Sequence, residues 1–150
     1  MIQEKAKRPR EPRSRVLDHT ADLRLEIEAP DLPGLFLEAA RASLGCLGRL
    51  VPSGADGETE QTSFHGRDTV DLLVDWLGEV LYRAQYLGRI PAPGARLEFE
   101  GATLAARVAW VPIDGKASRF DREVKAVTYH GLEVTGNPAS GYGATFILDV

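Results

Sequence analysis

The sequence predicts an α+β fold, a three-layer β-α-β sandwich in which two helices pack between β-sheets of about six strands. Strand patterns gather in the second half of the chain, after two helical patterns, which favours α+β over a doubly wound parallel sheet. The second helical pattern is apolar on nearly every side, so it must be covered on more than one side. With 150 residues, the chain is long enough for one domain with one hydrophobic core.

The first half of the chain alternates strands with helices. Residues 23–29 alternate apolar and charged side chains, as in a half-buried strand. Asp31 is placed to cap the helix that follows. The expected elements are a strand at 23–29, a helix at 31–47, a strand at 59–66 and a helix from Asp68 or Thr69 to about Tyr86. Turn-forming residues separate four further strands, expected at 96–100, 102–111, 123–134 and 143–149.

Charge is distributed unevenly along the chain. The formal net charge is −4, but residues 1–15 carry six basic and two acidic side chains. Residues 16–150 carry 12 basic and 20 acidic side chains, a net charge of −8, which is poorly suited to gripping a phosphate backbone. We therefore divide the chain into a disordered basic arm, 1–15, and one domain, 16–150. The arm could contact RNA, contact an acidic partner, or be a solvated terminus.

Composition excludes several classes of protein. No apolar run approaches the roughly 20 residues of a membrane span, and the first residues lack the apolar core of a secretory signal. The single cysteine, Cys46, rules out an internal disulfide and a cysteine-cluster zinc site, and is expected to fill the core. We expect a cytoplasmic protein that does not engage a membrane.

Carboxylates are the strongest candidates for chemistry, because Gly-rich phosphate loops, serine elbows and useful Cys/His pairs are missing. Asp18 and Asp22 flank His19 where the first strand begins, and Asp149 precedes the terminal Val150. Such hard oxygen ligands could converge on Ca²⁺ or Mg²⁺ and would not select zinc. The alternative is that they are ordinary turn and cap aspartates. The histidines at 19, 65 and 130 are scattered, and structural roles are favoured for them.

Two further patterns lie in the second half. Asp71, Asp75 and Glu79 recur every four residues and form one narrow acidic face of the second helix. A solvated edge is the favoured interpretation, with contact to a partner as the alternative. Spacing places Trp76 in the core, and Trp110, which ends a strand, is expected to be partly exposed.

Four motifs, taken in order, resemble those of one family. They are Asp18-His19-Thr20-Ala21-Asp22, the helical run from Leu72 to Tyr82, Val124-Lys125-Ala126-Val127-Thr128-Tyr129-His130, and Ile147-Leu148-Asp149-Val150. Together they resemble the archease family over residues 16–150. The arm lies outside the resemblance, and residues 51–58 and 112–119 follow no family pattern, as expected of variable loops.

The resemblance implies a function as well as a fold. Archeases are not known as enzymes; they activate the RtcB-type RNA ligase of tRNA splicing and RNA repair. They promote guanylylation of the ligase and multiple turnover, and can broaden its nucleotide use beyond GTP. The partner implied is therefore the ligase, with GTP and RNA reached only through it and no direct binding of nucleic acid.

The resemblance also implies a metal site. The family's ligands correspond to Asp22, Asp149 and Val150, and the cofactor implied is a divalent cation, with Ca²⁺ expected first and Mg²⁺ or Mn²⁺ as alternatives. No catalytic residue is implied.

Two other functions remain open. One is a chaperone-like modulator of other nucleic-acid enzymes, such as RNA methylases. The other is a metal-dependent hydrolase, in which Asp22 and Asp149 hold a catalytic ion and His19 or His130 acts as general base.

Overall fold

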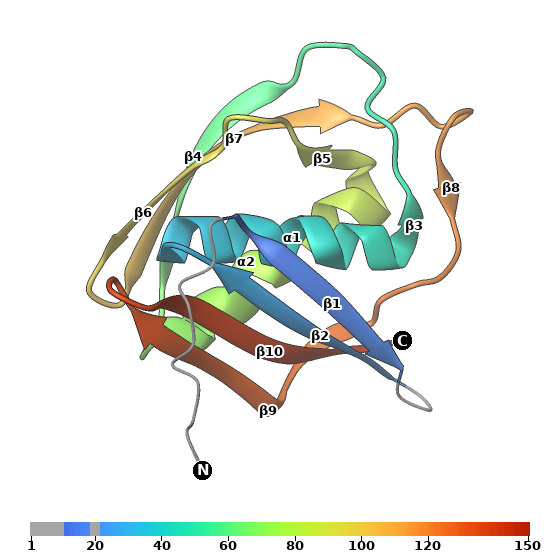
Figure 1. Cartoon of the computed structure of the whole chain (residues 1–150). Coiled ribbons are helices and arrows are strands. Elements are labelled where there is room, and N and C mark those ends of the chain that lie inside the picture. The colour runs from blue at the N-terminus through green and yellow to red at the C-terminus, as the bar shows by residue number, and fades with distance from the viewer. Residues whose placement is uncertain (1–10, 19–21) are drawn as a thin grey trace.

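Two helices lie between two antiparallel sheets in the computed structural model, which describes residues 11–18 and 22–150 (Figure 1). The helices are α1 (Leu32–Leu47) and α2 (Thr69–Tyr82). The first sheet has the order β1 (Arg13–Asp18), β2 (Asp22–Ala29), β10 (Gly141–Asp149) and β9 (Ala126–Asn137). In the second sheet, β7 (Thr103–Pro112) pairs with β4 (Glu58–His65), β5 (Arg89–Pro91) and β6 (Arg96–Glu100). The predicted three-layer α+β sandwich is confirmed.

The strands outnumber the six that the sequence predicts. A small sheet pairs β3 (Gly48–Arg49) with β8 (Arg119–Phe120), and these strands are too short for a periodic pattern to identify. The tightest approach between them is at Gly48, where a Cβ would lie 2.0 Å from the main-chain oxygen of Arg119. Glycine at this position, with φ of 146°, is therefore required by packing.

The additional strand β1 begins inside the range predicted as a disordered arm. Arg13 forms an ion pair with Glu28, and Arg15 donates to Glu26 at 2.8 Å, both on β2. Cross-strand pairs of opposite charge stabilise an antiparallel ladder. The composition of residues 1–15 alone does not predict such pairing, because the partners lie on another strand. Strand structure in the described residues therefore begins at Arg13, and residues 1–10 lie outside the described part.

The alternation on β2 places one row of side chains in the core. Leu23, Leu25, Ile27 and Ala29 are buried, and the charged residues between them are half-buried on the opposite face. Helix α1 begins where the Asp31 side chain accepts a hydrogen bond from the Gly34 N–H at 2.7 Å. Its buried face includes Cys46, which confirms the core position expected for the thiol.

Helix α2 is the central element of the core. Trp76 is fully buried, and its indole N–H donates to the main-chain oxygen of Phe36 on α1 at 2.9 Å. The Trp76 ring contacts Phe64 edge-on at 6.2 Å and lies 6.5 Å from the ring of Trp110. Trp110 is only 3% exposed, so the expected partial exposure is wrong: Arg83 covers its ring, with the guanidinium carbon 4.3 Å from the centroid.

Helix α2 ends at Tyr82 rather than at about Tyr86. A π-helical turn, η1 (Arg83–Leu87), extends it and stops at Gly88, whose φ is 63°. None of the helices in the described ranges is long and apolar enough to cross a bilayer.

Candidate functional site

Asp22 and Asp149 are direct partners across β2 and β10. Their sequence neighbours Leu23 and Leu148 are buried, so alternation directs both aspartates to the outer face of the first sheet. Directly opposed residues of an antiparallel pair have Cβ atoms about 5 Å apart. The fold thus brings together two carboxylates that are 127 positions apart in the sequence.

The last strand is held on both sides at this position. Asp149 pairs with Asp22 on β2 and with Ala126 on β9, and its main-chain oxygen accepts from the Lys125 N–H at 2.7 Å. Val150 follows Asp149 directly, and its main-chain oxygens are the next backbone acceptors along the chain. Val150 is half-buried and packs against the core, which fixes its place beside the start of β2 (Figure 1).

The donor set fits a hard divalent cation. Two carboxylates that face each other on one sheet surface repel, and a shared cation removes that repulsion. Carboxylate and carbonyl oxygens are the ligands that Ca²⁺ and Mg²⁺ take. No cluster of three or more His, Cys, Asp or Glu side chains suited to a metal ion occurs in residues 11–18 and 22–150.

The remaining residues of the first motif are only partly placed. Asp18 ends β1 and pairs with Leu23, so its backbone lies at the same end of the sheet as Asp22. His19, named as a general base for the hydrolase alternative, lies outside the described residues. His65 ends β4 in the second sheet and His130 lies on β9 in the first, and both are exposed.

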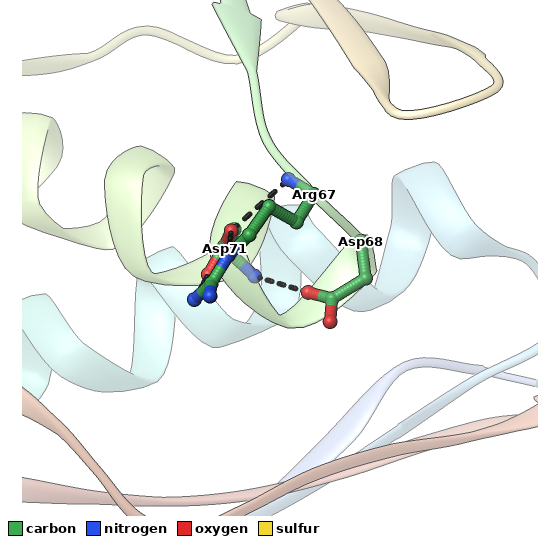
Figure 2. A network of polar contacts seen from close by, with 3 residues as sticks. All are labelled: Arg67, Asp68 and Asp71. Carbon is green, nitrogen blue, oxygen red and sulfur yellow. Dashed lines mark hydrogen bonds and ion pairs between the residues drawn. The ribbon is translucent and has the colours of Figure 1, made fainter.

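A second polar cluster surrounds the start of α2 (Figure 2). The Asp71 carboxylate accepts from the Arg67 main-chain N–H at 3.0 Å and from the Arg67 guanidinium Nε at 2.9 Å. The Asp71 N–H donates to the cap residue Asp68 at 3.0 Å. These hydrogen bonds from Arg67 hold the pKa of the Asp71 carboxyl well below its ordinary value.

A bulge brings Tyr129 to this cluster. Between Thr145 and Ile147 on β10, the partner on β9 jumps from Glu133 to Thr128, so residues 129–132 lie opposite Phe146 alone. Tyr129 is exposed, and its pKa is raised by partial burial and by the neighbouring Asp71 carboxylate. The bulge sits in one of the four sequence motifs, but alternation gives no signal for it.

The predicted acidic face of α2 divides into three different environments. Asp71 is 8% exposed and engaged with Arg67, so it is structural. Glu79 accepts from Arg83 at 2.7 Å, and Arg83 also pairs with Glu60 on β4. Only the exposed Asp75 matches the solvated edge that the spacing favours, and its side chain has no hydrogen bond or ion pair with any residue that the structure describes.

Comparison with known proteins identifies the family. The model of the Archease protein family (MTH1598/TM1083) matches residues 15–150. An archease of Methanosarcina barkeri is 30% identical over 139 residues, which cover 89% of this chain and 93% of that protein. An archease of Methanopyrus kandleri is 32% identical over 126 residues, covering 79% of this chain and 86% of that one.

Solved structures agree with this assignment. Protein 1598 of Methanobacterium thermoautotrophicum superposes with a TM-score of 0.67 at 25% identity, covering 91% of this chain and 98% of that one. An archease of Thermotoga maritima, described as a possible chaperone, gives a TM-score of 0.63 at 24% identity, covering 89% and 94%, a likeness of fold alone. The family model and the relatives span the domain that presents Asp22 and Asp149, and the chain belongs to the archease family.

Proposed function

We propose that this protein activates an RtcB-type RNA ligase, promoting its guanylylation and multiple turnover in tRNA splicing and RNA repair. The protein is then a non-catalytic partner that reaches GTP and RNA only through the ligase. Membership of the archease family supports the proposal. The single observation that carries its mechanism is the direct opposition of Asp22 and Asp149 on β2 and β10.

We further propose that Asp22, Asp149 and Val150 hold a divalent cation, with Ca²⁺ as the first candidate and Mg²⁺ or Mn²⁺ as alternatives. The two side-chain carboxylates and the main-chain oxygen of Val150 would be the protein ligands. A bound divalent ion would supply positive charge next to a nucleotide triphosphate or its metal. Because β10 is paired on both sides, the carboxylates are held on a rigid element rather than on a loop.

The chain's own residues would act by position and charge. The domain at 16–150 carries a net charge of −8, which complements an enzyme whose surface must be basic to bind RNA. Docking would bring the carboxylate pair to the ligase's nucleotide entrance, where it can orient the triphosphate or a metal bound to it. Alternatively, tighter binding to the guanylylation-competent conformation of the ligase would shift its population towards that state.

RNA ligation by a limiting amount of ligase tests the proposal. Product should rise beyond one turnover when the wild-type protein is added, and not when Asp22→Asn or Asp149→Asn is added. Asp56→Asn, in an exposed loop, is the matched control and should activate like the wild type. Full activation by both site variants would remove the carboxylate pair from the mechanism, and no activation by the wild type would overturn the ligase assignment.

The position of Val150 gives a separate test. If its main-chain oxygen is a ligand, a peptide appended after Val150 should reduce activation far more than one placed before Met1. Equal activity of the two fusions would exclude Val150 from the site.

A chaperone-like role towards other nucleic-acid enzymes is the second candidate. The description of the Thermotoga maritima archease as a possible chaperone favours it. Protection of an RNA methylase from aggregation, unaffected by Asp149→Asn, would support this function over ligase activation.

A further inference from the structure

Helix α2 leaves one stripe of its surface uncovered. Asp75, Gly78 and Tyr82 are exposed, and Tyr86 on the π-helical turn continues the line. These residues follow at intervals of three or four, so they share one face of the helix. The rest of α2 packs against α1, β4 and β9, which leaves the stripe at the side of the sandwich.

The C-terminal end of this stripe is aromatic. Tyr82 is 51% exposed and Tyr86 66% exposed, and their ring centroids are 5.6 Å apart. With Gly78 and residues 124–127, the two tyrosines line a groove of about 190 Å³. A second hollow, of about 440 Å³, adjoins the groove at Tyr86 and is walled by Phe120. The two exposed tyrosines and Phe120 give this region its apolar surface, and Asp121, Arg122 and Glu123 line the rest of the second hollow. Exposed apolar side chains that gather on one surface mark interaction sites.

Gly78 is unexplained by the fold itself. Glycine is among the least favourable residues in the interior of a helix. A Cβ added at Gly78 would meet nothing within 4 Å, so no neighbouring residue in this chain requires the missing side chain. A close approach from outside the chain gives the position a reason, because only glycine lets another backbone or side chain reach the helix surface.

Hydrogen bonds from Gln85 join the two walls of the groove. Its Oε1 accepts from the Val124 N–H at 2.9 Å, and its Nε2 donates to the Val124 main-chain oxygen at 3.0 Å. The Tyr86 hydroxyl donates to Glu123 at 3.4 Å. A groove formed in the free protein lowers the entropy lost on binding.

Charge indicates what occupies the groove. Asp75, at one end of the stripe, has no ion pair with a described residue, and neither do Asp22 and Asp149. The groove wall is joined through the backbone to the strand that carries Asp149, because Lys125 donates its N–H to the Asp149 oxygen and Ala126 pairs with Asp149, while the carboxylates at 22 and 149 lie on the outer face of that sheet. Lys125 is the one basic side chain among the groove's lining residues. The groove lining therefore holds no carboxylate, and the acidic charge lies around it, at the exposed Asp75 and in the net charge of −8 over residues 16–150. This overall charge is complementary to a basic protein face, such as an RNA-binding enzyme needs for its phosphate contacts.

We propose that the groove formed by Gly78, Tyr82, Tyr86 and residues 124–127 docks the basic face of an RNA-binding protein, with an apolar side chain seated beside Gly78. The inference rests on the proposed function and names the surface by which the ligase is held. The docking groove supplies affinity, and the carboxylate pair at 22 and 149 acts on the nucleotide.

Affinity for the RtcB-type ligase, measured by calorimetry, tests the groove. Gly78→Gln fills the proposed contact and should weaken binding at least about tenfold, equivalent to about 1.4 kcal/mol. Because glutamine favours helix more than glycine, the same variant should have a higher melting temperature than the wild type. Lower affinity in a more stable protein cannot result from unfolding.

Gly45→Gln is the matched control. Gly45 is exposed on α1 and a Cβ there also meets nothing within 4 Å, so this variant should bind the ligase like the wild type. Tyr86→Ala should weaken binding independently, and Asp75→Asn should reduce the salt dependence of the affinity.

The outcomes separate this inference from the proposed function. Wild-type affinity in both Gly78→Gln and Tyr86→Ala, with ligase activation intact, would overturn the groove and leave the function standing. Self-association that Gly78→Gln abolishes would assign the groove to a second copy of the chain and likewise overturn the proposal. Failure of the wild type to bind or activate the ligase would overturn both.

Discussion

Asp22 and Asp149 oppose each other directly across β2 and β10, with both carboxylates on the outer face of the first sheet. Like charges directly opposite destabilise a sheet, and a shared cation reverses the sign of that interaction. This relationship links the fold to a measurable property, the dependence of stability on divalent ions.

We predict that Ca²⁺ raises the melting temperature of the wild type and leaves that of Asp149→Asn unchanged. At a concentration 100 times the dissociation constant, one bound ion stabilises the folded state by about 2.7 kcal/mol. Without Ca²⁺, Asp149→Asn should be as stable as the wild type or slightly more so, by up to about 1 kcal/mol, because the repulsion is removed. Thermal unfolding with and without Ca²⁺ checks this, with Asp56→Asn as control; an equal shift in Asp149→Asn would contradict it.

Asp71 gives a prediction for the dependence of stability on pH. Its carboxyl has a pKa well below the ordinary 3.8 in the folded state, because Arg67 binds the ionised form. Because this pKa is lower in the folded state than in the unfolded state, the ionised carboxylate stabilises the fold at pH values above about 4. That stabilisation is lost as the pH falls below about 4. The urea midpoint should therefore fall less steeply between about pH 4 and pH 2 in Asp71→Asn than in the wild type. Asp75→Asn, on the same helix without an ion pair, should follow the wild-type curve, and equal slopes for Asp71→Asn and the wild type would refute the role of Arg67.

Trp76 is the side chain whose loss should cost most stability. It is fully buried and bonded to the main-chain oxygen of Phe36. Trp76→Ala should lower the free energy of unfolding by about 3–5 kcal/mol. Trp76→Phe should lose about 1–3 kcal/mol, because it removes the indole hydrogen bond to Phe36 and leaves a cavity where the larger ring lay. Urea denaturation measures both, and a loss below about 0.5 kcal/mol for Trp76→Ala, as for an exposed residue, would contradict the core assignment.

Cys46 should be unreactive in the folded protein. It is 8% exposed, and burial raises the pKa of its thiol, so little thiolate is present at neutral pH. A chromogenic disulfide reagent should label Cys46 slowly in buffer and rapidly in guanidinium chloride. Fast labelling of the folded protein would show that the thiol is accessible.

Much of the fold follows from local pattern. The alternation at 23–29 and the cap at Asp31 predict β2 and α1, and the all-round apolar character of α2 predicts the layer on each side of it. The parts that were not predicted depend on contacts distant in sequence. The strand β1 is defined by its antiparallel pairing with β2, and the burial of Trp110 depends on Arg83.

The candidate site shows the same division. Sequence alone places Asp22 and Asp149 at strand ends, but only the register of β2 and β10 makes them partners. The spacing of Asp71 and Asp75 predicts a shared helix face. It does not predict that Asp71 is buried and paired with Arg67 while Asp75 is exposed to solvent. The bulge that brings Tyr129 towards Asp71 has no local signal, because it is defined by a shift in pairing with β10.

Transfer of labelled GMP from GTP to the RtcB-type ligase measures the proposed activation itself. With this protein present at a small fraction of the ligase concentration, the wild type should accelerate guanylylation, and Asp22→Asn and Asp149→Asn should not, although both variants are folded. Guanylylation at the same rate with and without the wild-type protein would contradict the claim.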